Sequence, residues 1–352
     1  MSKLSEAATV AMKDCIGLRP GEEVLILTNY EGYDTYEISK ALFDATRELG
    51  GRPVLMIQEA KTSLQYAENA VLKAMEAAPD VIISISSIKM GKDPFGMQIG
   101  YIGKDGKKYD HIYHLLMEGS HRIRGFWSPS VTRDSFERCV AVDYTEMRAM
   151  ALKLKEVLDA GTQVRVTAPG GTDVSFSIAG REAKVDDGDF HRPGSGGNLP
   201  AGETYICPAV GSTEGVICFD GTVDLVTSFP IPKVPVRVVY KNGYVTEVTG
   251  DEVAEGLLNV IRMGEKKARD IGSAEMEKNA RHLGEMGIGL NYAAKMVGNM
   301  LEDEKVGRTV HFAIGMNYDN DANAFIHQDC LVKDPSVWVD GRQIMKDGNI
   351  VL

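Results

Sequence analysis

The first 160 residues alternate between amphipathic segments and short apolar runs. Residues 4–16, 33–49 and 63–77 place apolar side chains at helical spacing, which predicts three helices. Nearly continuous apolar runs lie before, between and after the last two of these helices and predict buried strands: GEEVLILTN, RPVLMIQ and PDVIISISS. Strands that alternate with helices in this way favour a mainly parallel sheet with helices on both faces.

Polar residues end two of the predicted strands. Asn29 and Ser86 stand where open α/β sheets usually hold ligands. The first strand is not followed by a GxGxxG pattern, so no dinucleotide site is predicted there. Residues 89–108 are rich in Gly and Lys and lack helical spacing. They predict either a hairpin that covers this crevice or a plain exposed loop.

The pattern changes after a predicted helix over residues 144–160, which ends at Gly161. Short alternating runs, separated by Gly, Pro and Asp, predict antiparallel strands: VRVTA, DVSFSIAG, GVICFDG and TVHFAIG are examples. The pair Asn242-Gly243 is the favoured chemistry of a tight hairpin turn. Helices are predicted only over about residues 251–270 and 293–301 in this part of the chain.

Composition narrows the class of protein. A chain of 352 residues exceeds the usual size of one core, so we expect an α/β domain over residues 1–160, and over residues 161–352 an α+β domain dominated by antiparallel strands. No apolar run is long enough to span a bilayer and the start lacks a secretory pattern, so we expect a cytoplasmic protein without membrane contact. The formal charge of −11 opposes nucleic-acid binding.

Several kinds of site lack sequence support. The five cysteines are odd in number, widely spaced and without a CxxC pair, which argues against a disulfide framework and a thiolate zinc site. The sequence contains no GxSxG, P-loop or HExxH motif. A serine nucleophile or a nucleotide mechanism is therefore not predicted.

The last quarter of the chain carries the main candidate chemistry. His327 and Asp329 are two residues apart in FIHQD, so in a strand both side chains point to one face and could grip one ion. His311 lies among apolar strand residues, where an imidazole needs a partner. Glu285 and Glu203 add two carboxylates. These side chains predict a divalent metal site, with chance proximity as the alternative.

Two kinds of metal centre fit these residues. Three carboxylates and two imidazoles suffice for two ions, which activate a water and bind the substrate oxygen in hydrolases. Tyr318 could then donate a hydrogen bond to the oxyanion. The smaller set of His311, His327 and Asp329 is the two-histidine, one-carboxylate arrangement of non-haem Fe(II) enzymes. The residues alone leave both open.

Three further residues are candidates for roles around the centre. His191 precedes a glycine-rich polar stretch that either borders a site or forms a solvated turn, and it is the best acid–base candidate there. Asn198, in the same stretch, is a candidate for binding substrate. His282 shares a face with Glu285 if their segment is helical, and otherwise is a surface residue.

Over most of residues 160–340 the chain resembles the metallo-aminopeptidase family typified by bacterial aminopeptidase T, especially its shorter leucyl aminopeptidase-like members. The matching segments are GTDVSFSIAGR, GNLPAGETYICP, LGEMGIGLN, LEDEKVGRTVHFAIGMNY and IHQD with WVDG. The resemblance implies two divalent ions (Zn, Co or Mn), a small peptide substrate and a homodimer or larger homo-oligomer. It places catalytic roles on Tyr318 and Glu285, and the metal ligands on Glu203, Glu285, His311, His327 and Asp329.

Two departures keep a second reaction in view. The connection between the two histidines is shorter than in the larger aminopeptidases, and the FIHQD segment is also similar to 2,5-dihydroxypyridine 5,6-dioxygenase, whose Fe(II) is held by two His and one Asp. Fold relationship cannot choose between the two reactions. We favour the dinuclear aminopeptidase, because burying Glu203 and Glu285 beside one ion is costly unless a second cation offsets them. A non-catalytic binding protein with a decayed site is the third alternative.

Overall fold

The structure is a computed structural model that describes residues 2–32, 34–62 and 65–352. The chain forms two compact units, which comprise Met1–Arg148 with Asp186–Ala201, and Ala149–Val185 with Gly202–Leu352. The sequence analysis placed one domain boundary near residue 160. In the structure the chain instead leaves the first unit after Arg148, returns to it for residues 186–201, and then completes the second unit.

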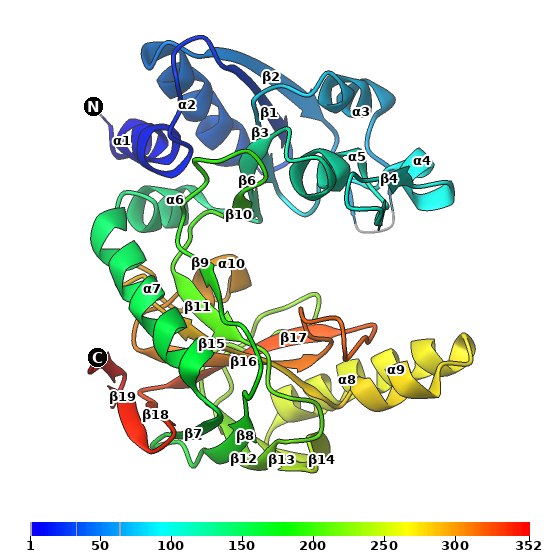
Figure 1. The fold of residues 1–352 in the computed structure, drawn as a ribbon, viewed down its shortest axis with the longest axis vertical. Helices are drawn as coiled ribbons and strands as arrows, with labels where there is room; N and C mark the ends of the chain where they lie inside the picture. The colour runs from blue at the N-terminus through cyan, green and yellow to red at the C-terminus, as the bar shows by residue number, and fades with distance from the viewer. Residues whose placement is uncertain (1, 33, 63–64) are drawn as a thin grey trace. The chain divides into compact units, whose positions relative to one another are not determined.

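The first unit is built on a parallel sheet of five strands (Figure 1). Its strands, in the order in which they lie side by side, are β10 (Gly196–Asn198), β6 (Arg124–Pro129), β3 (Val81–Ser86), β1 (Glu23–Asn29) and β2 (Arg52–Gln58). The central strand β3 is buried at every position, as expected for an apolar run covered on both faces. The predicted α/β class of this part of the chain is confirmed.

Helices surround this sheet. They are α1 (Lys3–Val10), η1 (Ala11–Cys15), α2 (Asp34–Glu48), α3 (Asn69–Glu76), α4 (Pro94–Gln98), α5 (Ile112–His114), η2 (Leu115–Gly119) and α6 (Arg133–Cys139). The predicted helix over residues 63–77 begins later, at Asn69, and residues 63 and 64 lie outside the described part. Part of the segment 89–108 forms a hairpin, from β4 (Tyr101–Ile102) to β5 (Lys108–Tyr109).

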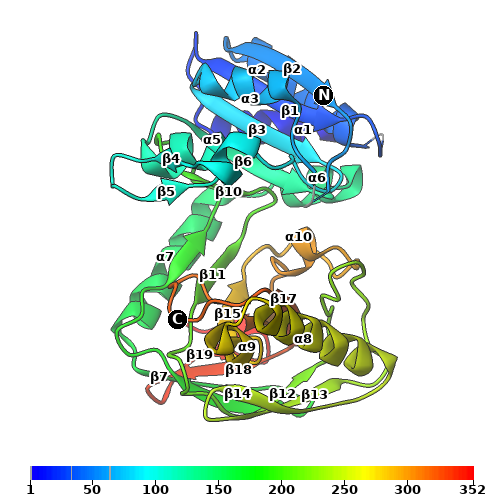
Figure 2. The same cartoon turned by 90° about the vertical axis from the view of Figure 1, so that its right-hand side faces the viewer.

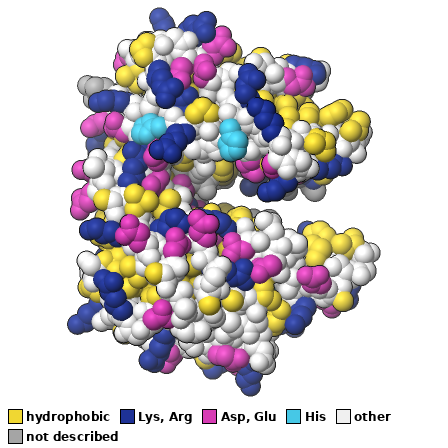
Figure 3. Space-filling model, viewed as in Figure 1, with side chains coloured by type: hydrophobic (Ala, Val, Ile, Leu, Met, Phe, Trp, Pro, Cys, Tyr) yellow, Lys and Arg dark blue, Asp and Glu magenta, His cyan; other side chains and the backbone are white. Residues whose placement is uncertain are grey.

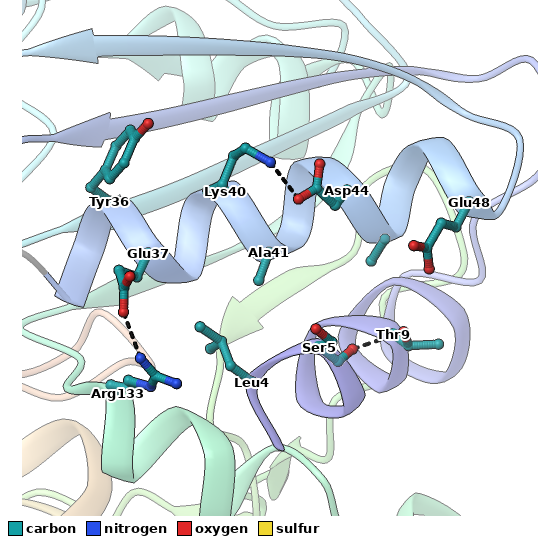
Figure 4. Close-up of a pocket in the computed structure, with 11 residues that line it drawn as sticks. Leu4, Ser5, Thr9, Tyr36, Glu37, Lys40, Ala41, Asp44, Glu48 and Arg133 are labelled. Atoms are coloured by element: carbon teal, nitrogen blue, oxygen red, sulfur yellow. Dashed lines mark hydrogen bonds and ion pairs between the residues drawn. The ribbon is translucent and has the colours of Figure 1, made fainter. Parts of the chain in front are cut away.

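A pocket beside α2 is lined by charged residues, most of which are paired with one another (Figure 4). Glu37 accepts from Arg133 at 2.6 Å, which ties α2 to α6, and Lys40 pairs with Asp44 one turn along α2. These contacts stabilise the packing of the helices and leave the pocket with little charge to offer a ligand.

Two sheets and three helices form most of the second unit, together with α7 (Tyr144–Ala160), which begins in the first unit (Figure 2). The larger sheet has the order β14 (Tyr244–Thr249), β13 (Val236–Lys241), β12 (Glu214–Phe219), β8 (Asp173–Ser177), β7 (Gln163–Thr167), β18 (Ser336–Val339), β19 (Arg342–Lys346) and β20 (Asn349–Ile350). All its neighbouring strands run antiparallel. The predicted class of this half is therefore confirmed.

The smaller sheet of the second unit carries the candidate chemistry. Its order is β17 (His327–Lys333), β16 (Thr309–Gly315), β15 (Leu283–Gly289), β11 (Glu203–Ile206) and β9 (Lys184–Asp186). The sheets pack through one face, where Phe312 of β16 meets Phe176 of β8 with ring centroids 6.4 Å apart. Because neighbouring residues of a strand face opposite ways, His311 and Ala313 must point away from that core.

The turns and helices of the second unit follow local chemistry. Asn242 and Gly243 both have positive φ and join β13 to β14, as the sequence predicted. The helices are α8 (Glu252–Asp270), α9 (Ala274–Asn279) and α10 (Met300–Asp303). The predicted helix over residues 293–301 is therefore wrong in extent. Asp303 instead accepts hydrogen bonds from the backbone N–H groups of Val297 and Gly298, which holds that segment in a turn.

Two findings bear on membrane contact and nucleic-acid binding, which the composition argued against. Over the described ranges, no helix combines the length and apolar character needed to cross a membrane. On the face drawn in Figure 3, acidic and basic side chains are interspersed. That face therefore shows mixed charge, within a chain whose formal net charge is −11.

Candidate metal centre

Four neighbouring strands bring the five predicted ligands to one face of the smaller sheet. Glu203 lies on β11, Glu285 on β15, His311 on β16, and His327 with Asp329 on β17. The spacing of two residues between His327 and Asp329 places both on the same face, as the sequence predicted. The structure therefore gathers residues that are separated by more than a hundred positions in the chain.

Small residues leave room for these side chains. Gly289 stands opposite Glu203 in the pairing of β11 with β15, and Gly287 stands opposite His311 in the pairing of β15 with β16. A Cβ atom on Gly287 would lie 2.1 Å from the Cε1 atom of His311, which is shorter than any contact such atoms make. On the face of β15 that carries Glu285, Gly287 and Gly289 therefore make room for His311 and Glu203.

The ligand atoms converge. His311 Nε2 lies 3.1 Å from Glu285 Oε1 and 3.4 Å from Glu203 Oε2. His327 Nε2 lies 3.5 Å from Asp329 Oδ1 and 3.9 Å from Glu285 Oε2. One ligand atom from each of Glu285, His311 and Asp329 falls within 4.8 Å of the others. These distances suit side chains arranged around a common cation.

Burial makes the charges of this cluster interdependent. Burial lowers the pKa of His311, but its hydrogen bond to Glu285 and the nearby carboxylates outweigh burial and raise that pKa to about 9. Burial raises the pKa of Glu285. Burial likewise raises the pKa of Asp329, yet the charge of His327 prevails and holds that pKa at about 2. The carboxylates therefore require positive charge beside them.

A separate observation, three buried carboxylate oxygens without hydrogen bonds in the described part of the chain, also indicates that these side chains fit a metal ion. Glu203 Oε2, Glu285 Oε2 and Asp329 Oδ1 are buried, and none of these three oxygens has a hydrogen-bond partner in the described ranges. Such oxygens are costly to bury unless they meet a cation. Imidazole nitrogen with carboxylate oxygen is a donor set that suits Zn²⁺, Mn²⁺ and Fe²⁺.

The ring of His327 is oriented by the backbone. Its Nδ1 atom lies 2.9 Å from the carbonyl oxygen of Met316, which can only accept a hydrogen bond. Nδ1 therefore carries the hydrogen, and Nε2 faces the carboxylates. A backbone partner on the far nitrogen is the usual support of a metal-binding histidine.

Lys305 is a functional candidate that the sequence analysis missed. Its side chain is 1% exposed, and its Nζ atom lies 2.6 Å from Glu203 Oε1 and 2.7 Å from Glu304 Oε1. An ammonium group thus neutralises the far side of the Glu203 carboxylate. The only sequence signal was a lysine between an acidic run and the apolar strand that carries His311.

Tyr318 lies at the edge of the cluster on an anchored loop. Its ring centroid is 4.9 Å from that of His327, and the side chain remains 46% exposed. Lys184 donates to the carbonyl oxygen of Tyr318 at 3.0 Å, and Arg181 pairs with Asp319 at 3.2 Å. The sequence analysis named Tyr318 as a candidate residue, but it did not name Lys184 and Arg181, which fix its loop.

His282 does not join the cluster. It precedes β15, so the helix that would align it with Glu285 does not form, and its side chain is fully buried with the ring 6.0 Å from that of Tyr244. The interpretation of His282 as a surface residue is therefore wrong. Its neighbours, Tyr244 of β14 and Gly315 of β16, are distant in sequence, so its position in the sequence did not reveal its burial.

His282 makes stability depend on pH. Burial lowers its pKa to about 4, so the folded chain resists a proton that the unfolded chain takes up near pH 6.5. A lowered histidine pKa means that stability is lost as the pH falls through 6.5 toward 4. Between pH 7 and 5 we expect wild type to lose about 2 kcal/mol more of its unfolding free energy than His282→Phe. Urea titrations at both pH values measure this, and equal losses would contradict it.

His191 and Asn198 belong to the first unit. His191 Nδ1 lies 2.7 Å from Asp189 Oδ1, and its ring packs against Gly17, where an added Cβ would lie 2.0 Å from the ring. Asn198, on β10, donates from Nδ2 to the carbonyl oxygen of Trp127 at 3.2 Å. Both residues have local structural partners, and their roles toward the cluster remain predictions.

The second unit thus gathers two imidazoles and three carboxylates into a group that could hold a metal ion, which is the kind of site found in metalloenzymes. The chain belongs to the NicX family, described as 2,5-dihydroxypyridine 5,6-dioxygenase, whose family model matches residues 132–352. No curated protein sequence matches the chain.

Two solved structures share the fold. The 2,5-dihydroxypyridine dioxygenase of Pseudomonas putida KT2440 is similar with a TM-score of 0.72 and 15% identity, over 100% of this chain and 98% of that one. Wild-type AmpT of Thermus thermophilus is similar with a TM-score of 0.67 and 16% identity, over 99% of both chains. Both resemblances expected from the sequence are thereby confirmed, and at these identities they establish the fold.

Proposed function

We propose that this chain is a mononuclear Fe(II) dioxygenase that cleaves the ring of a hydroxylated N-heteroaromatic such as a dihydroxypyridine. The observation that carries the proposal is the buried ion pair of Lys305 with Glu203. The ammonium supplies the positive charge that Glu203 needs, so this carboxylate does not require a second metal ion. The family match over residues 132–352 supports the same reaction.

His311, His327 and Asp329 would hold the ion, as two imidazoles and one carboxylate that leave positions open. When bound, Fe(II) supplies the redox chemistry by which O₂ reacts with an aromatic ring. The chain's own groups position the substrate. Glu285 Oε2, buried and without a hydrogen bond among the described residues, is available to accept one from a ring hydroxyl.

Tyr318 offers the substrate an aromatic surface. Its ring stands edge-on to that of Tyr205, with centroids 5.9 Å apart. It also lies tilted against the ring of His327. Aromatic rings prefer such offset or edge-on neighbours, so a planar substrate ring gains contact area here. The anchoring of the loop by Lys184 and Arg181 keeps this surface in place.

A metallo-aminopeptidase with two divalent ions is the second candidate. It is favoured by the number of buried carboxylates, because Glu203 Oε2, Glu285 Oε2 and Asp329 Oδ1 all lack hydrogen bonds within the described ranges. A second ion in this arrangement would have to share Glu203 with the ammonium of Lys305, only 2.6 Å from Oε1. Like charges so close repel, which disfavours the dinuclear centre.

Metal counting and two assays separate the candidates. Protein purified without oxygen and chelators, then loaded separately with Fe²⁺, Zn²⁺, Co²⁺ or Mn²⁺, is analysed for ions per chain. We expect one bound ion, together with O₂ uptake and loss of ring absorbance when the Fe²⁺ form meets 2,5-dihydroxypyridine. Two ions per chain with release of leucine from leucyl peptides, and no O₂ uptake, would overturn the proposal in favour of the aminopeptidase.

A further inference from the structure

The first unit contains a cavity of about 400 Å³ that the proposed reaction does not use. It lies at the carboxyl end of β3 and β6, the edge at which parallel sheets commonly hold ligands. Ser84 and Ser86 of β3 pair with Trp127 and Pro129 of β6, so these four side chains share one face of the sheet. No residue of the metal cluster lines this cavity.

The walls of the cavity are mainly apolar and aromatic. Trp127 and Tyr113 meet edge to face, with centroids 6.0 Å apart and an interplanar angle of 87°. Met90, Met97 and Met117 complete the lining, and methionine side chains adapt to flat ligands. Pockets of this size and polarity hold molecules of one or two rings.

The polar groups of the cavity are of two kinds. Asp93 is already committed, because its oxygens accept from the backbone of Phe95 and Gly96 and from the Tyr101 hydroxyl. His111 is committed too, with Nδ1 accepting from Tyr113 N and Nε2 placed 3.2 Å from Gly91 O. These side chains hold the cavity's rim in shape.

Hydroxyl and ammonium groups complete the polar lining at the strand ends. Ser84 and Ser86 are both buried and line the cavity, and across the described residues the buried hydroxyl of Tyr113 makes no hydrogen bond. The ammonium groups of Lys89 and Lys92 likewise form no ion pair there. Lys89 also lines the small adjoining cavity with both serines, so positive charge and hydroxyl donors meet at the strand ends.

We infer that this cavity binds a small planar aromatic carboxylate. The ring lies between Trp127, Tyr113 and the methionines, and the carboxylate accepts hydrogen bonds from the lysine ammonium groups and the serine hydroxyls. Charge-assisted bonds of this kind are the strong ones, so the acid group sets the specificity. The acids that also line the cavity, Asp110 and Glu118, are exposed, and Asp110 lies 3.1 Å from His114.

The test compares 2-naphthoate with its uncharged analogue 2-naphthamide on the full chain, by calorimetry and by ¹⁹F NMR of 5-fluorotryptophan. The chain has two tryptophans, and Trp338→Phe assigns the resonance of Trp127. We expect 2-naphthoate to shift the Trp127 resonance alone and to bind about tenfold more tightly than 2-naphthamide. His311→Ala, which disables the metal cluster, should leave this binding unchanged.

The lysines are tested together. The double variant Lys89→Gln with Lys92→Gln should weaken the binding of 2-naphthoate about tenfold and leave the binding of 2-naphthamide unchanged. The fold should persist, because both lysines pair with neighbouring segments through their backbones. Lys104→Gln with Lys107→Gln makes the same charge change on the neighbouring hairpin and should have no effect. The inference is overturned if the Trp127 resonance does not move, if the two probes bind equally, or if His311→Ala abolishes binding, which would assign the probe to the metal centre.

Discussion

Replacing His311 by alanine is expected to abolish stable metal binding and, with it, the proposed ring-cleaving activity. His311 is the imidazole whose Nε2 contacts both Glu285 and Glu203, and its side chain is 1% exposed, so water cannot readily replace it. Even residues that only support metal ligands lower metal affinity by about 10- to 100-fold when mutated, and loss of a ligand should exceed this. Ions per chain after dialysis, and O₂ uptake with 2,5-dihydroxypyridine, measure the effect.

His282→Phe is the matched control for this change. It removes another buried histidine from the start of the same sheet, but one that stands apart from the cluster. Its metal content should equal that of wild type. A circular-dichroism spectrum of His311→Ala that matches wild type ensures that the fold persists. Retention of one ion per chain in His311→Ala would show that the ligands have been assigned wrongly.

Replacing Lys305 by methionine is expected to have the second large effect, in two parts. Methionine has a similar shape but no charge, so Glu203 and Glu304 are left buried without their cation. Removing one partner of a buried ion pair typically costs about 3–5 kcal/mol, and metal-free Lys305→Met should lose stability of this order. Addition of Zn²⁺ should restore stability and raise the count from one to two ions per chain.

The two measurements for Lys305 are urea unfolding and metal analysis, each with and without Zn²⁺. Lys305→Arg keeps the positive charge and should still bind one ion. Lys155→Met removes an ammonium that pairs with Asp159 near the surface, so it should change neither quantity much. If Lys305→Met is as stable as wild type and binds the same number of ions, then Lys305 does not act as the resident counter-charge of Glu203.

The sequence predicted which residues gather in the cluster, but it did not predict which group neutralises the charge of Glu203. Ligands on strands are visible from spacing, because a separation of two residues fixes a common face, as in His327 and Asp329. The cost of burying Glu203 was also foreseen, but it was assigned to a second metal ion. Lys305 supplies that charge from a turn between α10 and β16, and no periodicity connects it with Glu203, a hundred residues earlier. Only the tertiary fold brings them together.

Elements with regular patterns were predicted well, and irregular ones were not. Buried strands such as β3 and the Asn242-Gly243 turn follow from local chemistry. The turn over residues 293–299 was mistaken for a helix, because its backbone N–H groups at Val297 and Gly298 donate to Asp303, which lies outside the segment. Burial of His282 depends on strands that are distant in sequence, so its exposure could not be read locally.

The return of residues 186–201 to the first unit affects how this chain folds during its synthesis. Strand β10 closes the free edge of β6, and Ser128 donates to the carbonyl oxygen of Leu199 from the same segment. During synthesis, the β6 edge of the amino-terminal sheet therefore emerges from the ribosome unpaired, and it stays so until more than sixty further residues, including all of α7, have followed. Open edges invite pairing with other chains. The nascent protein thus passes through an aggregation-prone interval that ends only when its second unit has begun to form.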